Sequence, residues 1–141
     1  MYKIELTPPT LEKFDLGGVL YHANYFHLFE QARERFLAEK AQLPYPTLVK
    51  QGQHLAIVET EVKYLKPVYY GDQLRITLSC TNLRNSSVVI HYKIYNLETS
   101  LLLNDSKTKL AFVSQKDGKF RPDKMPEQLI EALKQIEVYS S

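Results

Sequence analysis

The chain has a single cysteine, a small net charge and no long apolar run. With Cys80 alone, no internal disulfide can form, so nothing in the sequence requires an oxidising compartment. No segment is apolar over the length of a membrane span, and residues 1–10 lack the apolar core of a signal peptide. A formal net charge of +2 is too small to indicate nucleic-acid binding through bulk electrostatics. We therefore expect a cytoplasmic protein with no membrane span and no nucleic-acid partner.

Internal repeats, low-complexity stretches and linkers are also lacking in the 141 residues. An apolar share of 44% is ordinary for a soluble globular protein, and the length suffices for a substantial core. We therefore expect one domain over residues 1–141. Cys80 falls within an alternating strand pattern, which favours a small buried side chain over a reactive thiol.

A long helix is expected over residues 25–40, which contain no glycine or proline. Apolar side chains recur there at the spacing of one helix face. They are Tyr25, Phe29, Ala32 and Phe36. Charged residues occupy much of the remaining surface, so the pattern indicates an amphipathic helix. Asn24 is the expected N-cap of this helix.

After Gly52 the apolar period changes to two, which is typical of strands. Tight turns separate these segments, and an amphipathic helix follows the last of them. The expected strands are residues 2–6, 54–65, 74–81, 88–95 and 101–115, and the final helix is residues 126–135. Tight turns join antiparallel neighbours, so the sequence predicts an α+β fold in which one antiparallel sheet covers one long helix.

The most informative segment runs from Asp15 to His22, where a carboxylate precedes Gly17-Gly18 and then the start of the helix. The first N–H groups of a helix have no intrahelical acceptor, so they would point back toward this carboxylate. A nucleophile or general base beside such donors is what acyl transfer requires. An aspartate before two glycines is also common in ordinary turns, so this pattern alone leaves both interpretations open.

With this motif and this order of elements, the chain resembles the hotdog-fold thioesterases of the 4-hydroxybenzoyl-CoA thioesterase type, in particular their Tol-Pal-associated branch. The similarity covers residues 3–115. It rests on Asp15–Tyr25 with Glu30–Arg33, and on Tyr64–Pro67 with Tyr70–Asp72. The resemblance implies a hotdog fold, in which the antiparallel sheet wraps around the long helix. It also implies hydrolysis of an acyl-CoA to the free acid and CoA, with no cofactor and no metal.

The resemblance further implies roles for individual residues. Asp15 corresponds to the catalytic aspartate of the family, acting as nucleophile or general base, and the backbone N–H of His22 corresponds to its oxyanion donor. Lys13 departs from the pattern, because family members often carry an acidic residue at this position. The expected substrate contacts are Gly17, Gly18, Val19, Tyr21, Asn24 and Tyr25, and the expected CoA contacts are Lys63, Arg84, Asn85 and Ser86.

In this family two subunits pair their sheets edge to edge, with active sites at the interface, and dimers often associate further. We therefore expect a homodimer or a dimer of dimers. Two other functions stay open: a hotdog hydratase or dehydratase, which needs a catalytic histidine matched with an acidic residue on the helix, and a non-catalytic acyl-thioester binding protein. His27 and Glu30 share a helix face, but the sequence places no third metal ligand near them. The acyl group, short-chain aliphatic or aromatic, is not determined by composition.

Overall fold

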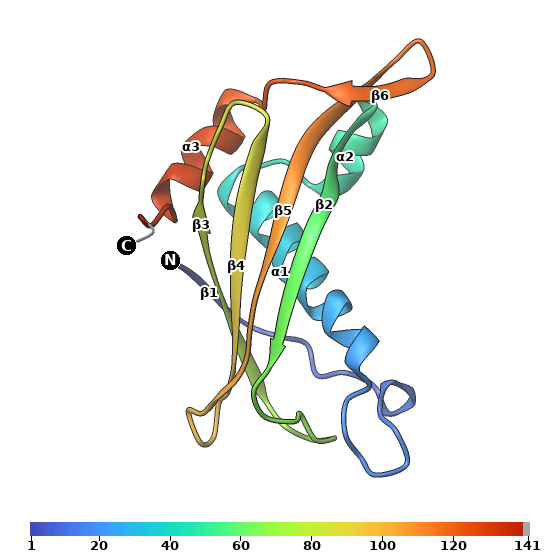
Figure 1. Ribbon diagram of the computed structural model, residues 1–141, viewed down its shortest axis with the longest axis vertical. Coiled ribbons are helices and arrows are strands. Elements are labelled where there is room, and N and C mark those ends of the chain that lie inside the picture. The colour runs from blue at the N-terminus through green and yellow to red at the C-terminus, as the bar shows by residue number, and fades with distance from the viewer. Residues whose placement is uncertain (140–141) are drawn as a thin grey trace.

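The computed structural model describes residues 1–139 and shows a curled antiparallel sheet lying against one long helix, α1 (Tyr25–Lys40) (Figure 1). The strands are β1 (Tyr2–Glu5), β2 (Gln53–Tyr64), β3 (Leu74–Thr81), β4 (Ser87–Asn96), β5 (Leu102–Lys116) and β6 (Lys119–Pro122). Their order across the sheet is β1-β3-β4-β5-β2, and β6 pairs with the end of β5. The predicted α+β arrangement of one antiparallel sheet around one long helix is confirmed.

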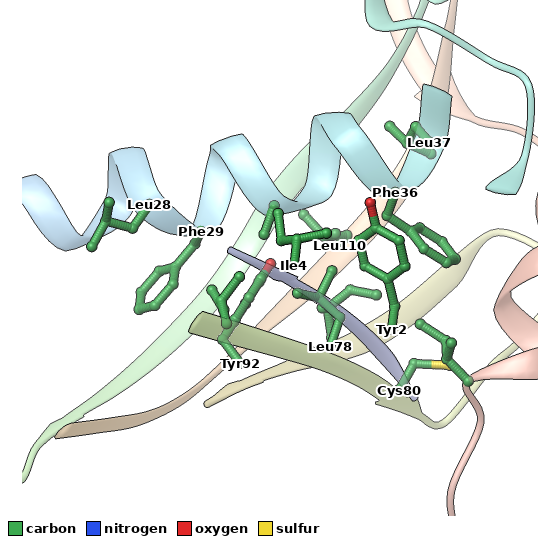
Figure 2. Packing of buried hydrophobic residues seen from close by; sticks show 14 of the residues in the cluster. Tyr2, Ile4, Leu28, Phe29, Phe36, Leu37, Leu78, Cys80, Tyr92 and Leu110 are labelled. Atoms are coloured by element: carbon green, nitrogen blue, oxygen red, sulfur yellow. The ribbon is translucent and has the colours of Figure 1, made fainter. Parts of the chain in front are cut away.

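The apolar face of α1 packs on the middle of the sheet. Phe29 has no exposed surface, and its ring stacks on Tyr92 of β4 with the ring centroids 4.6 Å apart (Figure 2). One turn further along α1, Arg33 donates a hydrogen bond to the Tyr92 hydroxyl at 3.0 Å. Phe36 is also buried and meets Tyr2 of β1 edge to face. The apolar face of the helix that the sequence predicts is therefore the face that packs in the core.

Two shorter helices complete the fold, α2 (Tyr45–Lys50) and α3 (Glu127–Gln135). The end of α3 is tied to β3, because the Cys80 N–H donates to the Ile136 carbonyl at 3.0 Å. Cys80 is fully buried, and this burial raises the pKa of its thiol to about 12. The prediction of an inert, buried cysteine is thus confirmed. No helix among residues 1–139 is long and apolar enough to cross a membrane.

One strand was not anticipated from the sequence. Asp117 and Gly118 adopt φ values of 54° and 76°, which form a tight turn that leads directly from β5 into β6. All four residues of β6 are exposed, and the strand ends at Pro122. A segment this short, with no buried face and a terminal proline, carries no alternating apolar signal.

The outermost strand, β2, pairs with β5 from Gln53 opposite Ser114 to Tyr64 opposite Asn104. The register shifts between Ile57 and Glu59, so Val58 is the extra residue of a β-bulge. The edge of β2 that faces away from β5 has no neighbouring strand in the part of the chain that the structure describes. Such an edge presents unpaired backbone groups and invites association with another chain.

The packing of Phe29 on Tyr92 gives a direct test of the fold. We expect Phe29→Ala to lower the free energy of unfolding by about 3–5 kcal/mol, because it leaves a cavity under α1. Phe26, on the same helix, is 42% exposed, so Phe26→Ala should cost less than about 1 kcal/mol. Urea unfolding of both variants measures the difference, and equal losses would contradict this packing.

Candidate active site

The loop that carries Asp15 is braced by the segment preceding β3. The Leu20 N–H donates to the Val68 carbonyl at 2.7 Å, and the Tyr70 N–H donates to the Gly18 carbonyl at 3.0 Å. Gly18 adopts a φ of 77°, a left-handed conformation that favours glycine. These bonds fix the loop against the end of the sheet where β2 finishes, beside the start of α1 (Figure 1).

The Asp15 carboxylate is held by one of its two oxygens. Oδ1 accepts hydrogen bonds from the N–H groups of Gly17 at 2.9 Å and Val19 at 3.1 Å. Oδ2 has no hydrogen-bond partner within residues 1–139. Two donors on one oxygen fix the plane of the carboxylate and leave the other oxygen free to act as a nucleophile or a base.

A short 3-10 turn, His22–Asn24, precedes α1, and Tyr21 is its N-cap. Asn24 occupies the N-cap position of α1, as predicted, but its side chain makes no capping hydrogen bond. Asn24 has helical dihedrals, and its Nδ2 donates instead to the Lys13 carbonyl at 2.9 Å. His22 occupies the first position of the turn, where a backbone N–H has no acceptor within the turn. This N–H is available to an oxyanion.

Asp15 and His22 lie on the same open cleft of about 420 Å³. The residues that line it are Asp15, Val19, Leu20, Tyr21, His22, Tyr25, Tyr64, Leu65, Lys66 and Pro67. Its far wall comes from the end of β2. There the Tyr64 hydroxyl donates to the His22 carbonyl at 3.2 Å, and the Tyr64 ring meets Tyr25 edge to face at 5.0 Å.

Tyr64 was not predicted as a site residue, although the motif Tyr64–Pro67 was noticed in the sequence. That motif was the available signal, because all four of its residues line the cleft. The structure brings five of the predicted site residues together in this cleft: Asp15, Val19, Tyr21, His22 and Tyr25. Gly17 and Gly18 belong to the loop beneath Asp15, while the amide of Asn24 is turned toward the Lys13 carbonyl.

The residues expected to bind CoA are not gathered at this cleft within one chain. Arg84, Asn85 and Ser86 lie in the β3–β4 turn, at the opposite end of the sheet from the cleft (Figure 1). On β5, Asn104 lies opposite Tyr64 of the cleft, and Ala111 lies opposite Ser87, which follows the β3–β4 turn. Asn104 and Ala111 are seven residues apart, so roughly 23 Å of extended strand separates the turn from the cleft. Arg84 lines a separate groove of about 910 Å³ with charged residues of β2 and β5.

Lys63 precedes Tyr64 and follows Val62, which packs against the core. Neighbouring side chains of a strand point to opposite faces, so Lys63 projects from the side of the sheet away from α1. His27 and Glu30 are exposed on α1 and 4.0 Å apart, which makes them a surface pair. Among the described residues, no group of three or more metal-ligating side chains comes together.

A comparison with known families is in accord with this geometry. The family described as the thioesterase superfamily matches residues 17–103, more than half of the chain. This chain belongs to the thioesterase superfamily. The match includes Gly17, Gly18, His22 and the Tyr64–Pro67 motif, so it spans most of the cleft described above.

Similarity to individual proteins supports the same family assignment. The chain is 29% identical over 124 residues to the acyl-CoA thioester hydrolase YbgC of Escherichia coli, covering 88% of this chain and 90% of that protein. It is 33% identical over 82 residues to the 1,4-dihydroxy-2-naphthoyl-CoA hydrolase of Thermosynechococcus vestitus, covering 58% of this chain and 56% of that one. Among solved structures, the dynemicin thioesterase superposes with a TM-score of 0.89 at 20% identity, over 99% of both chains. The last likeness supports the hotdog fold.

Two glycines offer a matched test of the loop. Gly18 and Gly118 both have left-handed φ values, 77° and 76°, and an added Cβ would meet no atom within 4 Å at either. We expect Gly18→Ala and Gly118→Ala each to cost about 1–2 kcal/mol of stability through backbone strain. Only Gly18→Ala should also reduce thioesterase turnover, because it displaces the loop that holds Asp15. Equal turnover in the two folded variants would contradict a role for this loop.

Proposed function

We propose that this protein is an acyl-CoA thioesterase in which Asp15 performs the chemistry and the His22 N–H stabilises the oxyanion. The observation that supports it is the free Oδ2 of Asp15 on the same cleft as the first N–H of the His22–Asn24 turn. The N-terminus of a helical turn stabilises negative charge where it develops on the thioester oxygen. The enzyme is proposed to act in the cytoplasm, since its one cysteine is buried and unpaired.

Asp15 can serve the reaction by two routes. As a nucleophile, Oδ2 attacks the thioester carbonyl, the CoA thiolate leaves, and water hydrolyses the resulting anhydride. As a general base, Oδ2 removes a proton from water, and the hydroxide attacks the same carbonyl before the thiolate leaves. Both routes place charge on the carbonyl oxygen, so both use the His22 N–H. Gly17 and Val19 hold Oδ1 in either case.

The walls of the cleft bear on the acyl group. Tyr21, Tyr25 and Tyr64 place three tyrosine rings around it. The relative from Thermosynechococcus vestitus is named for a naphthoyl-CoA, and the one from Escherichia coli for acyl-CoA in general. Short-chain aliphatic and aromatic acyl-CoAs are therefore the first substrates to test.

The proposed working unit is a homodimer formed through the open edge of β2, with a dimer of dimers as a further assembly. Pairing there would cover Ile57 and Val58, which are 55% and 57% exposed, and would exclude water from the neighbouring cleft. In such a dimer the β3–β4 turn of the partner approaches the cleft, because antiparallel edges bring opposite ends of the sheets together. Arg84, Asn85, Ser86 and Lys63 are proposed to contact CoA in this setting.

Loss of the Asp15 charge tests the mechanism. We expect Asp15→Asn to keep the fold and to lower kcat by at least about a hundredfold, as when a nucleophile or positioned base is lost. Asp123→Asn removes another hydrogen-bonded carboxylate, half-buried and far from the cleft within the chain, and should leave kcat unchanged. Release of free thiol from a panel of acyl-CoAs is the measurement.

The same assay separates the rival functions. A binding protein would bind acyl-CoA without releasing thiol, and a hydratase would change the acyl chain but leave the thioester intact. Normal turnover in a folded Asp15→Asn protein would discard the assignment of Asp15.

The dimer is tested by placing a charge on the open edge. Val58→Asp should convert the protein into a monomer and lower its activity, because the new carboxylate would be buried without a partner. Val138→Asp is the control, because Val138 is 44% exposed and its N–H donates to Cys80 of β3. In the strand order, β3 is separated from β2 by β4 and β5. Sedimentation at micromolar concentration gives the mass of each variant. A wild-type protein that is monomeric and fully active would overturn the shared interface.

A further inference from the structure

Lys66 is the only lysine or arginine among the residues of the described chain that line the active-site cleft. It is exposed, and its ammonium makes no salt bridge within residues 1–139. Lys63, three residues earlier, does not line the cleft, so Lys66 is the cation that this segment brings to the site. Neither route by which Asp15 acts makes use of this charge.

Backbone hydrogen bonds place Lys66 beside the turn that supplies the oxyanion donor. The segment that follows Lys66 pairs with the active-site loop in one antiparallel register, in which the Leu20 N–H donates to the Val68 carbonyl at 2.7 Å. Continued by two residues, this register brings Lys66 level with His22. The Tyr64 hydroxyl donates to the His22 carbonyl at 3.2 Å, so the end of β2 stays beside this turn.

The cleft is buried on one side and open on the other. Tyr25 is 3% exposed, whereas Leu65 is 51% exposed and Lys66 is exposed as well. The carbonyl of a bound thioester has to reach both Oδ2 of Asp15 and the His22 N–H, so its two substituents divide the rest of the cleft. The acyl group suits the buried aromatic side. The sulfur and the hydrophilic CoA arm have to lead out to solvent, which is the side of Lys66.

We propose that Lys66 is a catalytic residue whose ammonium stabilises the thiolate as it leaves. When the tetrahedral intermediate collapses, the C–S bond breaks and its electron pair passes to the sulfur of CoA. The ammonium donates a charge-assisted hydrogen bond to this sulfur and keeps its proton, so CoA departs as the thiolate. Both routes open to Asp15 contain this step. The inference rests on the proposed thioesterase function and adds a group that acts on the leaving sulfur.

Thioesters with different leaving groups test this role. An alkyl thiolate is a stronger base than an aryl thiolate, so it needs more stabilisation when it leaves. One acyl group is therefore supplied as three thioesters: the acyl-CoA, the neutral N-acetylcysteamine thioester and the thiophenol thioester. The first two release an alkyl thiolate, and only the first carries phosphates. Release of thiol is followed in a single turnover, so that product dissociation does not contribute to the rate.

Lys66→Met keeps the length of the side chain and removes its charge. We expect it to slow thiol release about tenfold or more from both alkyl thioesters, the effect of losing a hydrogen bond to a charged group, and to leave the thiophenol thioester nearly unaffected. Lys66→Arg keeps a cationic donor and should restore most of the rate. Lys40→Met is the matched control, because it removes the same charge from the opposite end of α1, and it should behave as wild type with all three thioesters.

Every other pattern contradicts the proposal. A loss confined to the acyl-CoA would mean that Lys66 attracts the phosphates of CoA and not the leaving sulfur. An equal loss with all three thioesters, or no loss with any of them, would also overturn it. If the wild-type protein hydrolyses none of the three, the proposed thioesterase function fails, and the role of Lys66 fails with it. If the wild type hydrolyses them and Lys66→Met shows no dependence on the leaving group, only the role of Lys66 fails.

Discussion

The contact between Phe29 and Tyr92 anchors the long helix on the sheet. Both side chains are fully buried, so α1 has little freedom to slide or rotate at this point. One turn before Phe29, Tyr25 meets Tyr64 at the end of β2, which places the start of the helix beside the edge strand. The direction in which the first N–H groups point is therefore set by core packing between residues that do not line the cleft.

The loop that carries Asp15 is organised by backbone carbonyls and amides more than by side chains. The Lys13 carbonyl accepts both the Tyr21 N–H and the Asn24 amide, which closes the loop onto the start of the helix. Lys13 contributes to this loop through its backbone carbonyl and not through its side chain. Charge at the position can therefore vary while the carboxylate and the oxyanion donor stay in place.

The sequence predicted the parts of the structure that depend on local periodicity. α1, α3 and the strands β2 to β5 each have a repeating apolar pattern, and the Asp15 to His22 segment indicated acyl transfer before its geometry was known. β6 has no buried face and was missed. Asn24 occupies the N-cap position that the local rule predicts, but its side chain caps no helix N–H, and its amide donates to the Lys13 carbonyl, eleven residues earlier. The contact between Tyr64 and His22 joins residues 42 apart, so only the tertiary fold brings them together.

Tyr64 belongs both to the cleft and to the edge strand. Its hydroxyl holds the turn that supplies the oxyanion donor, while its backbone lies on the edge proposed to meet a second chain. A subunit that separates from its partner would leave Tyr64 at a frayed strand end, with less to hold that turn. Catalytic competence would then depend on protein concentration: specific activity would fall on dilution, and the cellular abundance of the enzyme would itself set the fraction of chains able to work.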